Sequence, residues 1–142
     1  MPRMIFVNLP VADVAKATAF YEAIGFEKNP TFSNEQASAM VWSDSIYVML
    51  LEHAFYRTFT NKEIIEARTH SGALLALSFD SRAEVDAITQ AALAAGGTEM
   101  HEPEDLGFMY SRAFDDLDGH GWGPFTMDMA AATATHAQPA EA

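Results

Sequence analysis

The feature that most constrains this chain is a strand–helix pattern that occurs twice. In the first copy, Asp13 is a good N-cap for an amphipathic helix, and Gly25 stands where a left-handed residue commonly ends one. In the second copy, Ser81 and Glu84 form a capping box and Gly96 forms the stop. From Asp13 and Glu84 to Gly25 and Gly96 the copies align without a gap, and before that point the second copy is longer. A duplicated strand–helix unit is therefore predicted.

Apolar residues recur at helical spacing in both copies and predict one buried stripe on each helix. The stripes are Val14, Ala17, Tyr21 and Ile24, with Phe20 at the edge, and Val85, Ile88, Ala92 and Ala95. Further predicted strands are residues 4–11, 26–29, 37–43, 46–52, 74–80, 98–101, 109–115 and 122–127. A capping box at Thr60 and Glu63 also predicts a short helix over Asn61–Ala67.

Composition limits the class of protein. The chain has 142 residues, enough for one domain, and contains no cysteine, which excludes disulfides and thiolate chemistry. No apolar run is long enough to span a membrane, and the N-terminus lacks a signal-peptide pattern, so a cytoplasmic protein is predicted. The net charge of −12 opposes nucleic-acid binding. It would attract cationic ligands, or serve solubility alone.

Two motifs add a resemblance to a known family. The first helix ends in FYEAIGF (20–26), and the last hairpin turns through DLDGHGW (116–122). With the duplication, they make the chain similar to the vicinal oxygen chelate superfamily, which includes glyoxalase I, the bleomycin-resistance proteins and extradiol dioxygenases. The resemblance covers residues 4–129. It implies an α+β fold in which two tandem βαβββ modules form an open curved sheet or barrel. Many members are dimers, so a homodimer is expected.

The implied modules are residues 4–52 and 73–129, joined by a connector over 53–72 and forming a single domain. The last residues, 130–142, are rich in alanine, show no period and are predicted to be disordered.

The resemblance also implies a divalent metal held by the first and fourth strands of each module. The corresponding positions here are Phe6, Leu74, Gly123 and either Met49 or Leu51. A Zn, Ni, Mn or Fe site needs about three or more nitrogen or oxygen donors, which these side chains cannot supply. We therefore expect no cofactor and an apolar pocket that binds a small molecule.

Alternation from these positions predicts which side chains line that pocket. They are Phe6, Asn8, Leu74, Ala76, Ser78, Gly123 and Phe125, together with Met49 or Leu51 from the fourth strand of the first module. Further pocket candidates, whose facing alternation leaves open, are Arg112, Trp122, Trp42, Tyr47 and Tyr110. Arg112 lies between Tyr110 and Phe114 on a predicted strand. It could clamp a carboxylate or phosphate, or pair with an Asp or Glu at the edge of the barrel.

Other chemistry finds little support. The five histidines include no pair at the helical spacing of a zinc helix. No serine lies in a G-x-S-x-G motif, and no glycine-rich phosphate loop occurs.

Three classes of function remain open at this stage. The first is a metal-free protein, similar to the bleomycin-resistance branch, that sequesters an aromatic or cationic compound. The second is a metal-dependent enzyme resembling glyoxalase I or a dioxygenase, with Zn, Ni, Mn or Fe. The third is a domain that only dimerises, which the connector aromatics Phe55, Tyr56 and Phe59 would favour.

Overall fold

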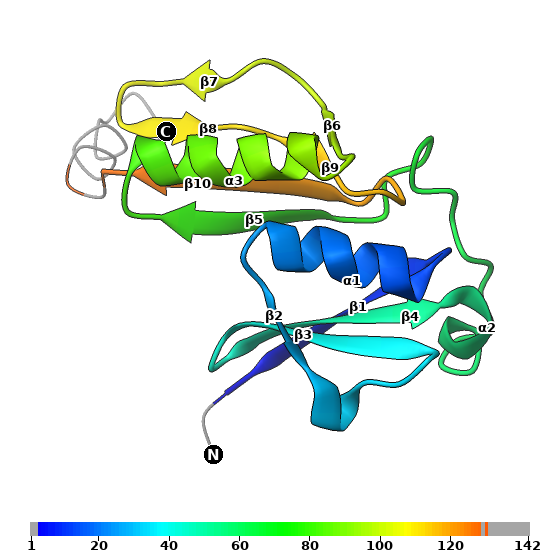
Figure 1. Cartoon of the computed structure of the whole chain (residues 1–142). Coiled ribbons are helices and arrows are strands. Elements are labelled where there is room, and N and C mark those ends of the chain that lie inside the picture. Colours follow the sequence, from blue (N-terminus) through cyan, green and yellow to red (C-terminus); the bar gives the residue numbers. More distant parts are fainter. Residues whose placement is uncertain (1–2, 129, 131–142) are drawn as a thin grey trace.

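The computed structural model describes residues 3–128 and 130, and the statements below concern these residues. The first module contains β1 (Ile5–Val11), α1 (Val14–Ala23), β2 (Glu27–Asn29), the short 3-10 helix η1 (Pro30–Phe32), β3 (Ala37–Ser43) and β4 (Ile46–Glu52). The connector begins with α2 (His53–Tyr56). The second module contains β5 (Leu74–Phe79), α3 (Arg82–Ala94), β6 (Thr98–Glu99), β7 (Glu104–Asp105), β8 (Met109–Ser111), β9 (Phe114–Asp115) and β10 (Gly121–Met127). The predicted α+β fold with a repeated βαβββ plan is confirmed (Figure 1).

Each module builds one sheet with its helix on one side. The first sheet has the order β1-β4-β3-β2, with β1 parallel to β4. In the second sheet β5 runs parallel to β10, and β10 pairs antiparallel with both β8 and β9. The predicted strand over 109–115 is therefore interrupted between β8 and β9, although both pieces lie along the same neighbour.

The predicted ends of the helices are confirmed. Asp13 Oδ1 accepts a hydrogen bond from the Lys16 backbone N–H at 3.0 Å and caps α1. Ser81 Oγ accepts one from the Glu84 N–H at 3.2 Å and caps α3. Gly25, with φ +111°, stands in the left-handed region just after α1, a conformation that glycine adopts at little cost.

The helix predicted over Asn61–Ala67 is wrong. Thr60 Oγ1 accepts a hydrogen bond from the Lys62 N–H, two residues on, so the hydroxyl supports a turn rather than a helix cap. Its apolar residues, Ile64 and Ile65, are adjacent and give no helical stripe that could be buried. The segment instead runs as turns and irregular chain over the ends of β1 and β5.

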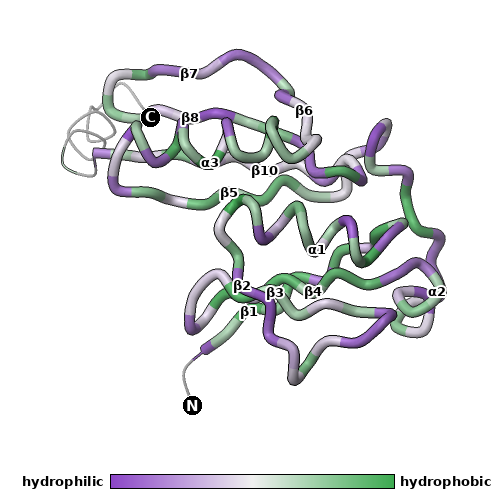
Figure 2. Tube along the Cα trace, viewed as in Figure 1, coloured by the Kyte–Doolittle hydropathy of each residue, from purple (hydrophilic) through white to green (hydrophobic). Residues whose placement is uncertain are grey.

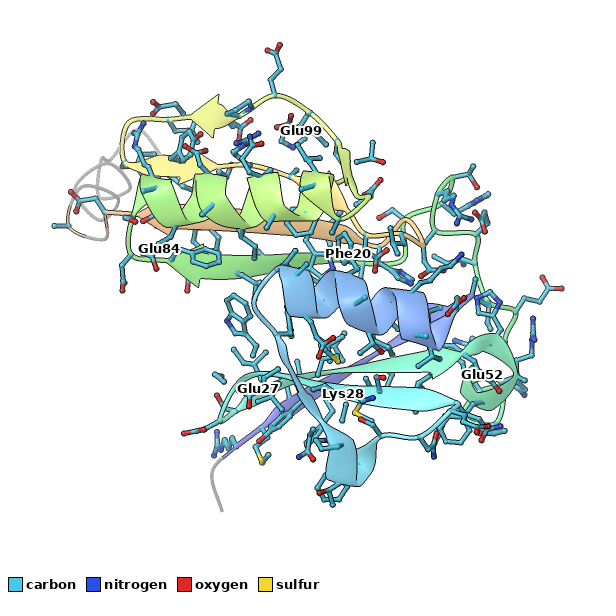
Figure 3. The ribbon with its side chains drawn as sticks, viewed as in Figure 1. Phe20, Glu27, Lys28, Glu52, Glu84 and Glu99 are labelled. Carbon is cyan, nitrogen blue, oxygen red and sulfur yellow. The ribbon has the colours of Figure 1, made fainter. Side chains whose placement is uncertain are left out.

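The two modules share one hydrophobic core. Figure 1 shows α1 between its own sheet and the second module, and Figure 3 labels Phe20 at that boundary. Phe20 and Tyr21 of α1 pack against Phe114 and Trp122 of the second sheet, with ring centroids 6.3 Å apart for Phe20–Phe114 and 5.9 Å apart for Tyr21–Trp122. Figure 2 shows hydrophobic residues along the strands of the first sheet and along β5, and both sheets contribute residues to the buried core. Burial of these rings against each other joins the modules into one cooperative unit.

The tail predicted to be disordered, residues 130–142, lies outside the described residues except for Ala130. None of the described helices is long and apolar enough to cross a membrane.

Candidate functional site

A buried chain of hydrogen bonds connects the two sequence motifs. The Trp122 indole N–H donates to the Tyr21 hydroxyl at 2.9 Å, and that hydroxyl donates to Asp116 Oδ2 at 2.5 Å. The other Asp116 oxygen accepts from the backbone N–H groups of Asp118 and His120, each at 2.9 Å. The helix end FYEAIGF and the turn DLDGHGW thus meet in space. Their residues hold the modules together.

Burial shifts the pKa values of the two titratable groups in this hydrogen-bonded chain, Asp116 and Tyr21. It raises the pKa of Asp116 above its ordinary value, although the nearby His120 and the hydrogen bond from Tyr21 act in the opposite direction. Burial, and then the charge of Asp116, raises the pKa of Tyr21 well above its ordinary value. Tyr21 is therefore a neutral hydrogen-bond donor at physiological pH.

The same turn also fixes the end of β1. His120 Nε2 lies 2.7 Å from the Pro10 carbonyl oxygen, and since a carbonyl can only accept, this ring nitrogen carries the proton. Asp118 Oδ1 accepts from the Ala12 backbone N–H at 2.9 Å. These contacts place the turn before β10 beside the first strand of the other module.

A cavity of about 590 Å³ opens next to this joint. Its walls are residues 7–10 of β1, Tyr56 of α2, most of the connector between Thr60 and Ala73, the start of β5, Met100, Asp115 and residues 119–121. The exposed surface of the lining is mostly apolar, although charged side chains such as Lys62, Glu63, Arg68 and Asp115 also line it. The size suits a drug-sized molecule. These are the usual features of a small-molecule site.

Gly119 is what allows the connector to close over this cavity. Its φ is +93°, and a Cβ atom placed on it would lie 2.5 Å from the Arg68 backbone nitrogen. The backbone of the connector therefore approaches the turn more closely than any side chain would permit. Arg68 adds a hydrogen bond from its guanidinium to the Leu117 carbonyl at 3.0 Å.

The predicted pocket residues fall into two groups, and the first lies on open sheet faces. Strand pairing sets Asn8 beside Met49 on the first sheet, and Ala76 beside Gly123 and Ser78 beside Phe125 on the second. Neighbours in a ladder share a face, so each of these pairs lies on one face of its sheet. Phe6 stacks on Tyr47 with ring centroids 4.6 Å apart and is 51% exposed, and Leu74 is 73% exposed. Of the predicted set, Asn8 and Leu74 line the 590 Å³ cavity.

The second group is buried and does not line the 590 Å³ cavity. Trp122 is 3% exposed and belongs to the core between the modules. Leu51 is 2% exposed; it shares a face with its partner Pro10, at the end of the sheet where α2 packs on β1 and β4.

Arg112 is also buried, and its guanidinium is already bound. One NH group donates to Asp86 of α3 at 3.1 Å and another to Glu99 at 2.8 Å, so Arg112 points to the helix side of the sheet (Figure 3 labels Glu99). The idea that it clamps a ligand is therefore wrong, and the alternative of an ion pair with Asp and Glu is what the structure shows. The interruption between β8 and β9 hid its facing from the sequence pattern.

The side chains at the metal positions implied by the resemblance do not fit a metal. Phe6, Leu74, Gly123 and Met49 or Leu51 bring no nitrogen or oxygen donor. Elsewhere in the described part of the chain, no group of three or more His, Asp or Glu side chains is placed to hold an ion.

The fold is what this chain shares with proteins of known structure. Several solved structures that superpose on it are described as glyoxalase/bleomycin resistance protein/dioxygenase proteins. One, a family enzyme from Burkholderia phytofirmans PsJN, has a TM-score of 0.76 at 18% identity and covers 89% of this chain and 100% of its own. The fosfomycin resistance protein FosX from Mesorhizobium loti has a TM-score of 0.64 at 16% identity, covering 93% of this chain and 95% of its own. The predicted resemblance to the vicinal oxygen chelate superfamily is confirmed.

A family model and one further solved structure also match this chain. Residues 3–41 match the family model "Bleomycin resistance protein-like N-terminal". The hypothetical protein SA1046 from S. aureus is 25% identical, with a TM-score of 0.75, and covers 89% of this chain and 95% of its own. No curated protein matches the sequence.

Sequence reasoning missed most of the cavity wall. The connector supplies much of it, and its path depends on the contact between Gly119 and Arg68, residues far apart in the chain. A local signal existed only for the turn, where D-x-D-G-H indicates a tight reversal.

Proposed function

We propose that this protein binds a small organic molecule in the cavity between β1, the connector and the start of β5, without a metal centre. The observation that carries the proposal is the cavity itself, because it combines a volume of about 590 Å³ with a mainly apolar exposed surface and polar side chains that could orient a ligand. The resemblance to bleomycin-resistance proteins supports a binding role. The absence of donors at the metal positions supports binding over metal-dependent catalysis.

A thermal-shift screen in the presence of EDTA tests the proposal. A ligand at 100 times its Kd adds about 2.7 kcal/mol to the free energy of unfolding. For a chain of this size, we expect the Tm to rise by roughly 5–10 °C. Leu74→Asp, which puts a charge into the apolar wall, should abolish the rise.

Leu106→Asp is the matched control, because Leu106 is also an exposed leucine of the second module but does not line the cavity. It should retain the full thermal shift. If both variants kept the shift, the ligand would bind elsewhere. If the shift required Zn, Ni, Mn or Fe, the metal-dependent enzyme would become the better interpretation.

We further propose that the chain forms a homodimer through the open sheet faces. Phe6, Tyr47 and Met49 form a bulky face on the first sheet, whereas Ala76, Ser78 and Gly123 form a face of small side chains on the second. Exposed aromatic surface of this kind is costly to leave in water. Sedimentation velocity over a concentration series should show a species of twice the 15.5 kDa chain mass. A monomer at all concentrations would contradict this assembly.

A further inference from the structure

The three aspartates at the last turn do different things. Asp116 accepts hydrogen bonds from Tyr21 and from the backbone of the turn, and Asp118 accepts one from the Ala12 backbone N–H. In the part of the chain that the structure describes, the Asp115 carboxylate accepts no hydrogen bond. It comes from β9 and lines the cavity.

The surroundings of Asp115 are apolar. Its Oδ1 lies near bare Gly121, since a Cβ built on that glycine would be 3.6 Å from this oxygen. The same Cβ would lie 2.9 Å from a Leu74 methyl group and 3.3 Å from the Met100 methyl group. A carboxylate, two apolar side chains and a glycine therefore share one corner of the cavity. Burial, followed by the charge of Asp116, raises the pKa of Asp115, so this half-buried carboxylate is partly removed from water.

The nearby cations are occupied or peripheral. The His120 ring partly offsets the raised pKa of Asp115, but it donates its Nε2 proton to Pro10. Arg68 binds Glu66 and the Leu117 carbonyl. Lys62 and Glu63 are both exposed on the connector side and have opposite charges. Among the described residues, no cationic side chain donates a hydrogen bond to the Asp115 carboxylate in this corner of the cavity.

We propose that the cavity recognises a ligand carrying a protonated amine, whose N–H groups donate to Asp115 while its apolar body contacts Leu74 and Met100. This inference rests on the proposed function and specifies its ligand class. A cationic N–H donor offsets the free-energy cost of holding a carboxylate partly out of water. A neutral molecule of the same shape offsets less of that cost. The net charge of −12 adds a long-range attraction for cations.

Three probes that share an indole ring test the inference by calorimetry at pH 7 in EDTA, using the full chain. Tryptamine carries an ammonium group, tryptophol a hydroxyl group and indole-3-acetate a carboxylate. We expect tryptamine to bind at least tenfold more tightly than tryptophol, and indole-3-acetate to bind most weakly. Asp115→Asn should bring the ratio of the tryptamine and tryptophol Kd values close to one.

Asp44→Asn is the matched control, because it removes the same charge from a turn in the other module that does not line the cavity. It should preserve the preference for tryptamine, which separates a local contact from long-range attraction. Equal binding of tryptamine and tryptophol to the wild type, no binding of any probe, or a preference that survives in Asp115→Asn would overturn the inference.

The two proposals can fail separately. If Leu74→Asp abolishes binding of tryptamine and tryptophol, and both bind the wild type equally, the cavity is the site and the amine inference fails. If Leu74→Asp affects neither probe, binding occurs outside the cavity and the proposed function fails as well.

Discussion

Replacing Tyr21 with phenylalanine is expected to lower the free energy of unfolding by about 3 kcal/mol. The substitution keeps the ring in the core but removes the hydroxyl between Trp122 and Asp116. It leaves a buried N–H group and a buried carboxylate oxygen without their partner, and each such loss costs about 1–3 kcal/mol. Urea denaturation followed by Trp fluorescence measures the change, which corresponds to a Tm roughly 10 °C lower.

Tyr47→Phe is the control for Tyr21→Phe. The Tyr47 hydroxyl also donates a hydrogen bond, to the Asp44 carbonyl at 3.2 Å, but at an exposed position. Its loss should change stability by no more than about 0.5 kcal/mol. Similar effects of the two substitutions would contradict the role of the buried chain.

The cost of Tyr21→Phe should depend on pH. The folded-state pKa of Asp116 is raised, so its protonation favours the folded state. That stabilisation is complete below the unfolded-state pKa and is lost as pH rises through the folded-state pKa. Tyr21 donates to the ionised carboxylate, so its removal costs most at neutral pH and less once Asp116 is protonated. A destabilisation that is constant from pH 7 into the acid range would contradict this explanation.

Gly119→Ala is the second substitution with a large expected effect, about 3 kcal/mol of lost stability. A left-handed conformation costs a non-glycine residue about 1–2 kcal/mol, and forced contacts add about 1–3 kcal/mol. Here the added methyl group would meet backbone atoms of Ala67 and Arg68 at 2.7 and 2.5 Å, and backbone cannot rotate away. The connector would have to move, so the variant should also bind cavity ligands more weakly.

Gly107→Ala separates the two contributions. Gly107 also has a positive φ, +83°, but a Cβ placed there would meet nothing within 4 Å. Gly107→Ala should lose only the stability that a left-handed conformation costs a non-glycine residue, and it should retain ligand binding. If thermal melts showed equal losses for both variants, the close approach between the turn and the connector would not matter.

Much of the fold was predictable because its signals are local. Caps at Asp13 and Ser81, glycine stops and alternating strands each depend on a few neighbouring residues. The hairpin strands β3 and β4 have the bounds that the sequence indicated. The helix predicted after Thr60 was wrong because a hydroxyl that caps a helix can equally support a turn.

The candidate site was less predictable because it depends on contacts between distant residues. Asn8 and Leu74 of the predicted set line the cavity, but the sequence pattern carried no information about the connector residues that line it with them. The interruption between β8 and β9 concealed that Arg112 faces α3. The role of Asp115 could not be separated from those of Asp116 and Asp118, since all three have the same chemistry in the sequence.

The joint at Tyr21 shows that the two repeats are no longer interchangeable. In the gapless alignment, Tyr21 corresponds to Ala92, and both are fully buried. One repeat supplies the large ring and its hydroxyl, and the other supplies a small residue at the equivalent place together with the turn that receives the hydrogen bond. Each half has become a specialised complement to the other. A chain made of two identical first repeats, or of two identical second repeats, would lack one side of this joint.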